Sequence, residues 1–199
     1  MAIEVEAKYR VDSHDLILSQ LADARLAGSC TFPANQIEVD VYYKHPSRDL
    51  VASDEWLRLR TVTTHRALNN TSEIVYLVTY KGPALDSKVK SRQEIEIRTG
   101  ASLDILFNVL GFKPFVSVIK NRQYYSCYIE DFTDNSDLRH VAICLDTVEH
   151  LGKFVEFEIV CEEQSKEKAK EKILRIARKL GLQDKDLETR GYAKLMMLK

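Results

Sequence analysis

The sequence lacks several features that would assign a function directly. It contains no glycine-rich phosphate loop, no internal repeat and no low-complexity segment. No apolar run approaches the length that spans a bilayer, and the first residues have no apolar core of a signal peptide. We therefore expect a soluble, cytoplasmic protein with no membrane partner.

Cysteine, histidine and net charge also give little direction. The four cysteines, Cys30, Cys127, Cys144 and Cys161, include no pair at zinc-ligand or redox spacing, so we interpret them as small apolar residues of a reducing compartment. The five histidines are scattered. With 29 basic and 30 acidic residues the net charge is -1, which gives no overall electrostatic basis for binding nucleic acid. Local charge must therefore determine the function.

The most informative stretch is the first strand that the sequence predicts, residues 3–10. Every second residue is charged, and side chains alternate between the two faces of an extended chain. Glu4, Glu6, Lys8 and Arg10 therefore share one face. For a single strand, the ordinary interpretation is a half-exposed strand with its polar side in water.

Paired like charges at alternate positions recur in four other strand-like runs. They are Arg58 and Arg60, Glu94 and Glu96, Lys120 and Arg122, and Glu156 and Glu158. Like charges side by side repel, which is unfavourable on a face that serves only solubility. If the sheet closes with these faces inward, the acidic pairs can hold a divalent metal and the basic pairs can hold phosphate.

Turn residues and periodicity predict an α+β fold in a single domain, residues 1–199. Eight strands with mostly short connections indicate an antiparallel sheet that can close on itself. Their ranges are 3–10, 36–44, 56–62, 73–81, 91–98, 115–128, 138–146 and 153–161, with a polar loop at 63–70 and a turn at 131–137. Helices are expected from Asp12 to about Gly28 and from Ser102 to Gly111. The C-terminal part, 162–199, carries a helix over 165–181, whose lysines we expect to face solvent, and a last helix over 184–198.

In order along the chain, these pieces resemble the CYTH family, which includes class IV adenylyl cyclases, thiamine triphosphatases and inorganic triphosphatases, also called triphosphate tunnel metalloenzymes. The matching segments are Glu4-Val-Glu6-Ala-Lys8, Leu57-Arg58-Leu59-Arg60, Thr79-Tyr80-Lys81-Gly82-Pro83, Ser91-Arg92-Gln93-Glu94-Ile95-Glu96, Leu110-Gly111-Phe112, Lys120-Asn121-Arg122 and the run from Leu145 to Glu158. The segments Lys81-Gly82-Pro83 and Leu110-Gly111-Phe112 are most similar to the class IV cyclase branch.

The resemblance implies an eight-stranded antiparallel barrel, residues 1–161, that forms a tunnel for a triphosphate, with the C-terminal helices packed on it. It also implies Mg²⁺ or Mn²⁺ as cofactor. The implied metal-facing residues are Glu4, Glu6, Asp146, Glu156 and Glu158. The implied phosphate-binding residues are Lys8, Arg58, Arg60, Lys81, Arg92, Lys120 and Arg122. Lys8, Glu94 and Glu96 are the candidates for catalysis, and Arg190, Tyr192 and Lys194 are candidates for closing the tunnel.

Two reactions fit such a site, and the sequence leaves the choice open because it shows no adenine pocket. A cyclase would convert ATP to cyclic AMP and pyrophosphate, whereas a hydrolase would cleave tripolyphosphate, thiamine triphosphate or a nucleoside triphosphate. A non-catalytic polyphosphate- or nucleotide-binding module is a third possibility. Glu94 and Glu96 could orient the attacking water or pair with Arg60 and Arg122. A monomer and a homodimer are both compatible with the sequence.

Overall fold

The computed structural model describes residues 2–22, 28–31, 35–66, 71–85, 89–129 and 138–199. The strands are β1 (Ala2–Val11), β2 (Gly28–Thr31), β3 (Asn35–Lys44), β4 (Trp56–Arg66), β5 (Thr71–Lys81), β6 (Lys90–Thr99), β7 (Lys113–Ile129), β8 (His140–Val148) and β9 (Gly152–Glu162). The helices are α1 (Asp15–Ala22), α2 (Asp104–Val109), α3 (Lys166–Lys179) and α4 (Tyr192–Met197), with short 3₁₀ turns at Glu163–Ser165 and Asp184–Asp186.

Eight of these strands form a closed antiparallel barrel. Their order around the ring is β7-β3-β4-β5-β6-β1-β9-β8, and pairing of β8 with β7 closes it. This arrangement confirms the predicted α+β fold with an eight-stranded barrel. The ninth strand, β2, was not predicted. It pairs with β7 next to the residues opposite the start of β3, so β2 and β3 lie one after the other along β7.

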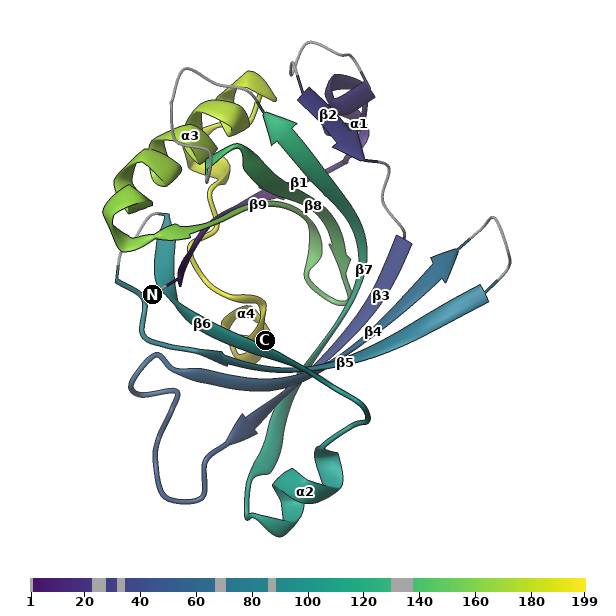
Figure 1. The fold of residues 1–199 in the computed structure, drawn as a ribbon, viewed down its shortest axis with the longest axis vertical. Coiled ribbons are helices and arrows are strands. Elements are labelled where there is room, and N and C mark those ends of the chain that lie inside the picture. The colour runs from purple at the N-terminus through teal and green to yellow at the C-terminus, as the bar shows by residue number, and fades with distance from the viewer. Residues whose placement is uncertain (1, 23–27, 32–34, 67–70, 86–88, 130–137) are drawn as a thin grey trace.

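The main apolar core lies outside the barrel wall, between the sheet and α3. On β1 the odd-numbered residues Val5, Ala7 and Tyr9 point to this side, and on β9 Phe157 and Ile159 do the same. They pack with the apolar stripe of α3, and Figure 1 shows that helix covering this part of the barrel. Burial of each large apolar side chain stabilises the fold by about 1.5–3 kcal/mol. Because successive strand residues alternate in direction, Glu4, Glu6 and Lys8 of β1 and Glu156 and Glu158 of β9 face the interior.

A second, smaller core fixes α4 at one end of the barrel. Tyr192 and Leu195 pack with Phe154, Val118 and Trp56. Figure 1 shows α4, next to the C-terminus, across the opening of the strand ring. In the part of the chain that is described, no helix is long and apolar enough to cross a membrane.

Some predicted boundaries are wrong. β4 and β5 extend farther than predicted, and they reduce the expected 63–70 loop to residues 67–70, which lie outside the described residues. The last helix does not begin near 184, because residues 187–191 separate a 3₁₀ turn from the short α4. The predicted turn at 131–137 and the end of the first predicted helix, 23–27, also lie outside the described residues.

The cysteine interpretation is wrong for two residues, because Cys30 and Cys127 form a disulfide across 97 positions. They are directly opposite each other on β2 and β7, a pairing that spacing alone does not indicate. Cys144 and Cys161 are buried thiols, as small apolar residues would be. The α3 lysines are also not all solvated: Lys172 is 1% exposed and donates a hydrogen bond to the Ile129 carbonyl.

Candidate functional site

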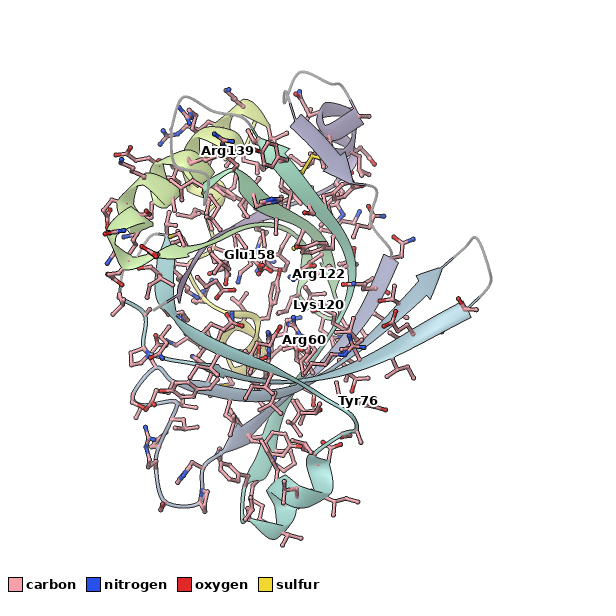
Figure 2. All side chains as sticks on the ribbon, in the orientation of Figure 1. Arg60, Tyr76, Lys120, Arg122, Arg139 and Glu158 are labelled. Atoms are coloured by element: carbon pink, nitrogen blue, oxygen red, sulfur yellow. A yellow bond between two sulfur atoms is a disulfide. The ribbon has the colours of Figure 1, made fainter. Side chains whose placement is uncertain are left out.

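One cavity of about 830 Å³ occupies the interior of the barrel. Among the described residues its lining includes nine acidic and nine basic side chains. They come from β1, β3, β4, β5, β6, β7 and β9, together with Asp54 before β4 and Lys194 of α4. Figure 2 shows Arg60, Lys120, Arg122 and Glu158 within the strand ring. The alternating charged faces therefore share one interior space and are not the solvent side of an ordinary sheet.

All the side chains expected to bind phosphate line this cavity: Lys8, Arg58, Arg60, Lys81, Arg92, Lys120 and Arg122. The alternation of the strands produces this convergence, since the pairs at 58 and 60 and at 120 and 122 each lie on one face of a strand. Burial alone would lower the pKa of Lys81, but nearby Glu4 and Glu94 outweigh it and the pKa is raised. Lys81 is therefore a permanent cation at neutral pH, and its role in binding phosphate stays a prediction.

Buried carboxylates on β3 hold several of these cations, and the sequence did not indicate them. Asp40 accepts hydrogen bonds from Arg60 Nε at 2.6 Å and Arg60 Nη2 at 2.8 Å, and from Arg58 Nη1 at 3.3 Å. Glu38 Oε2 lies 2.9 Å from Lys120 Nζ and 3.0 Å from Arg60 Nη1. Although burial opposes ionisation, Arg60 and Arg58 outweigh it and lower the pKa of Asp40.

Asp146 of β8 also holds a cation, as Asp40 does. The resemblance implied that Asp146 faces a metal, but the structure pairs it with Arg122. Its carboxylate accepts two hydrogen bonds from Arg122, at 2.7 and 2.6 Å, and one from the Tyr192 hydroxyl at 2.9 Å. Asp146 is 0% exposed and is not part of the described cavity lining. The structure therefore places it behind Arg122, where it orients the guanidinium.

The other four acidic residues expected to face a metal, Glu4, Glu6, Glu156 and Glu158, all line the cavity. Glu6 and Glu158 are directly opposite each other on β1 and β9, where like charges destabilise a strand pair. Burial raises the pKa of Glu158 to about 7, with Arg122 opposing and Glu156 adding to the shift. Burial likewise raises the pKa of Glu4 against the influence of Lys81. For Glu6, burial also opposes ionisation, but Lys8 together with the other cavity cations outweighs it and lowers the pKa to about 2.

These carboxylates fit a divalent cation in chemistry, but they do not form a ready-made cage. Carboxylate oxygens are the ligands that Mg²⁺ and Mn²⁺ prefer, and a cation would relieve the repulsion between Glu6 and Glu158. Within the described residues, however, no group of three or more histidine, cysteine, aspartate or glutamate side chains is arranged to hold a metal ion. Lys8 lies 3.6 Å from Glu6 and 3.5 Å from Glu156, and Arg122 contacts Glu156. A metal would have to replace some of these ion pairs.

Glu94 and Glu96 also line the cavity, and both pair with cations. Pairing with Arg60 and Arg122 was one of the two alternatives that the sequence left open, but the partners in the structure are Lys81 of β5 and Arg58 of β4. Glu94 lies 2.7 Å from Lys81 Nζ and 3.8 Å from Arg58 Nη2. Glu96 lies 3.5 Å from Arg58 Nη2 and accepts a hydrogen bond from the Thr79 hydroxyl at 2.9 Å. The register explains the change, because β6 pairs with β5 and lies far along the ring from β7.

The three C-terminal candidates separate in the structure. Tyr192 is buried in the cavity wall, with Lys8 Nζ 4.2 Å from its ring centre. Lys194 lines the cavity, and its Nζ lies 3.2 Å from a carboxylate oxygen of Asp54. Arg190 pairs with Glu188 outside the described lining, so the structure does not bring it to the site.

Two further cavity residues, Lys90 and Gln36, were not predicted, because neither belongs to one of the pairs of like charges on which the prediction rested. Lys90 is directly opposite Glu6, and burial lowers its pKa to about 8 despite the influence of Glu6. Gln36 is opposite Arg122. Lys90 continues the alternation of Arg92 and Glu94 by one step toward the N-terminus, so a longer predicted strand would have included it. Gln36 carries no charge that would have distinguished it.

Comparison with known proteins identifies the family. The CYTH domain model matches residues 2–192. The chain belongs to the CYTH domain family. A Methanocaldococcus jannaschii protein named "Putative adenylate cyclase" is 28% identical over 97% of this chain and 98% of its own. The adenylate cyclase CyaB of Aeromonas hydrophila is 26% identical over 96% of this chain and 87% of its own.

Solved structures share the fold of this chain. A Pyrococcus horikoshii protein is 35% identical with a TM-score of 0.74, covering 98% of this chain and 97% of that one. A Hippeastrum protein, named for adenylyl cyclase activity and described as having a dominant triphosphatase activity, has a TM-score of 0.58 at 16% identity, covering 98% of this chain and 93% of its own. At that identity the likeness shows the fold alone.

Proposed function

We propose that this chain is a metal-dependent enzyme that binds a triphosphate in the barrel and converts ATP to cyclic AMP and pyrophosphate. The observation that carries the proposal is the convergence of seven basic and four acidic candidate residues on one interior cavity. Two full-length relatives with adenylate cyclase names support the choice of reaction.

The cations would bind the phosphate chain. A triphosphate carries about four negative charges, and its transfer depends mainly on positioning and electrostatic stabilisation. Arg60 and Arg122 suit this task because Asp40 and Asp146 already hold their guanidinium groups by two hydrogen bonds each. Their geometry is therefore fixed before the substrate arrives, which lowers the cost of binding.

The metal would be held by Glu4, Glu6, Glu156 and Glu158. When bound, Mg²⁺ or Mn²⁺ would neutralise phosphate charge and allow the two opposed carboxylates, Glu6 and Glu158, to ionise together. Asp146 is left out of this set because Arg122 and Tyr192 already occupy its oxygens.

In the cyclase reaction the ribose 3′-hydroxyl attacks the α-phosphorus, and the bond to the bridging oxygen of the leaving pyrophosphate breaks. Glu96 is the candidate acceptor of the hydroxyl proton, because it is the more exposed carboxylate of its pair. Glu94 serves to hold Lys81, which it contacts at 2.7 Å. Lys8, between Glu6 and Glu156, is placed to stabilise charge on the leaving pyrophosphate.

Hydrolysis of a triphosphate is the alternative reaction. It would use the same cations, with water as the nucleophile in place of the ribose hydroxyl. The Hippeastrum protein shows that an adenylyl cyclase name on this fold can accompany a dominant triphosphatase activity. The two reactions therefore have to be distinguished by their products.

The test is incubation of the pure protein with Mg²⁺ or Mn²⁺ and, separately, ATP, tripolyphosphate and thiamine triphosphate, with products identified by phosphorus NMR. Cyclic AMP and pyrophosphate from ATP are the expected products. Orthophosphate and a diphosphate as products would show that the protein is a hydrolase and not a cyclase. No product from any substrate would overturn both and leave a non-catalytic binding module.

A further inference from the structure

The segment that leads into α4, residues 187–191, lies along β1 at the position of Lys8. Leu187 forms a bridge with Tyr9, and the Glu188 backbone N–H donates a hydrogen bond of 2.7 Å to the Lys8 carbonyl. Figure 1 shows the chain passing from α3, outside the barrel wall, to α4 at the opening of the strand ring. The end of the chain is therefore fixed to a strand residue whose side chain enters the cavity.

Tyr192, the first residue of α4, extends this contact to the side chain of Lys8. Lys8 Nζ lies over the Tyr192 ring at 4.2 Å from its centre, and Lys120 Nζ lies over the same ring at 5.4 Å. Both lysines are buried, at 3% and 2% exposure. A cation within about 6 Å of the ring centre is attracted to the ring face, more strongly where water is excluded. One aromatic side chain thus contacts two of the cations expected to bind phosphate.

The ring is a large part of what holds the Lys8 ammonium group. The carboxylate oxygens that pair with Lys8 Nζ, from Glu6 and Glu156, lie 3.6 and 3.5 Å away. Both distances exceed the ~2.8 Å of a charge-assisted hydrogen bond. Because the lysine stem is flexible and its ammonium group acts as a point charge, these ion pairs alone leave its position loosely defined. The face of the Tyr192 ring restricts where that charge can lie.

The ring itself is fixed by contacts at its edge and at its hydroxyl. Phe154 meets it edge-on, with the ring centres 5.1 Å apart. The Tyr192 hydroxyl donates a hydrogen bond of 2.9 Å to Asp146, whose carboxylate holds the guanidinium group of Arg122. Packing therefore sets the orientation of the ring before any ligand is present.

We infer that Tyr192 is a positioning residue whose ring face holds the ammonium groups of Lys8 and Lys120 where they bind the phosphate chain. This role goes beyond closing the tunnel, because an aliphatic side chain of similar volume would close it equally well but would not attract the cations. Its consequence for phosphate binding rests on the proposed function, whereas the contact between the ring and the two lysines does not.

NMR of the ligand-free protein, with ¹³C-labelled lysine ε-methylene groups, tests the contact. Protons over the face of an aromatic ring resonate upfield, so the signals of Lys8 and Lys120 should lie upfield of those from exposed lysines, and Lys8→Met and Lys120→Met assign them. We expect Tyr192→Phe to keep both signals upfield and Tyr192→Leu to shift them to the exposed position. Wild-type signals at the exposed position, or upfield signals that persist in Tyr192→Leu, would show that the inference is wrong.

Calorimetric titration with tripolyphosphate, without divalent metal, measures the consequence for binding. We expect Tyr192→Leu to weaken binding about tenfold, in the range of buried cation–π contacts. Tyr192→Phe keeps the ring and should stay within about threefold of the wild type. The matched control is Leu195→Ala, which removes an apolar contact of α4 in the same core at a residue outside the cavity lining, and it should bind within about twofold of the wild type. Melting temperatures check that each variant is folded.

The outcomes separate failure of the inference from failure of the proposed function. If Leu195→Ala weakens binding as much as Tyr192→Leu, the effect comes from the packing of α4 and the inference is wrong. If Tyr192→Phe binds as weakly as Tyr192→Leu, the hydroxyl and not the ring face is responsible, and the inference is again wrong. If the wild type binds no tripolyphosphate, the proposed function fails, and the lysine signals still decide whether the ring holds the two cations.

Discussion

Replacement of Asp40 by Asn tests whether buried carboxylates hold the cations of the cavity in place. Asp40 is 1% exposed and accepts three hydrogen bonds, two from Arg60 and one from Arg58. Asparagine has nearly the same shape but no charge, so it leaves two buried guanidinium groups without their shared counter-ion. Breaking a buried ion pair by removing one partner costs about 3–5 kcal/mol.

We therefore expect Asp40→Asn to lower the melting temperature of the ligand-free protein by at least about 6 °C, since 1 kcal/mol corresponds to about 2–4 °C at this chain length. Saturating tripolyphosphate should reduce the difference in melting temperature between the variant and the wild type, because phosphate oxygens give Arg58 and Arg60 new anionic partners. The control is Asp12→Asn, which removes an exposed carboxylate and should not change melting.

Differential scanning calorimetry with and without tripolyphosphate measures both effects. If ligand-free Asp40→Asn melts at the wild-type temperature, the carboxylate does not hold the arginines. If saturating tripolyphosphate leaves the difference in melting temperature unchanged, the two arginines do not contact the phosphate chain.

The remaining predictions concern the metal-facing glutamates and the disulfide. The double variant E156Q/E158Q should abolish turnover but retain part of the tripolyphosphate affinity, measured against Glu162→Gln on the exposed end of the same strand; full activity would refute the metal role. Because burial raises the pKa of Glu158 to about 7, above its value in the unfolded chain, the folded state holds an extra proton between about pH 5 and 7. The free energy of unfolding of the ligand-free protein should therefore fall as the pH rises through this window, and Glu158→Gln should flatten that slope in urea titrations. Reduction of the Cys30–Cys127 bridge, which closes a loop of 97 positions, should lower stability by up to about 4–5 kcal/mol in calorimetry, and Cys30→Ser should melt like the reduced protein.

The barrel and its charged interior were predictable because period-two alternation fixes which residues share a face. Glu6, Arg58, Lys120 and Glu158 each follow this rule and meet in the cavity. The charge pattern left the closure of the sheet as a condition, and the eight-stranded barrel was implied by the resemblance to the CYTH family.

The carboxylates that pair with Arg60 and Arg122 were not predictable, because these pairs depend on the register between neighbouring strands. Asp40 is opposite Arg60, and Asp146 is opposite Arg122. Alternation along a strand shows that Asp40 shares a face with Glu38, but it does not show which basic residue lies across the strand pair. For the same reason Asp146 was expected to face a metal, whereas its partner strand directs it to a guanidinium.

The disulfide and α4 illustrate two further limits. Cys30 lies on a four-residue strand too short to give a clear pattern, so its neighbour Cys127 could not be inferred. The six-residue α4 is fixed by tertiary contacts of Tyr192 and Leu195, not by local helix propensity. The C-terminal residues that reach the cavity therefore had to be located by the structure.

The most direct test of the central claim, that the charged strand faces form one triphosphate-binding cavity, is the melting temperature of the wild-type protein with millimolar Mg²⁺ and tripolyphosphate or ATP. A ligand at about 100 times its dissociation constant stabilises the folded state by about 2.7 kcal/mol, which predicts a rise of about 5–10 °C. An unchanged melting temperature with every triphosphate, with and without the metal, would contradict the account.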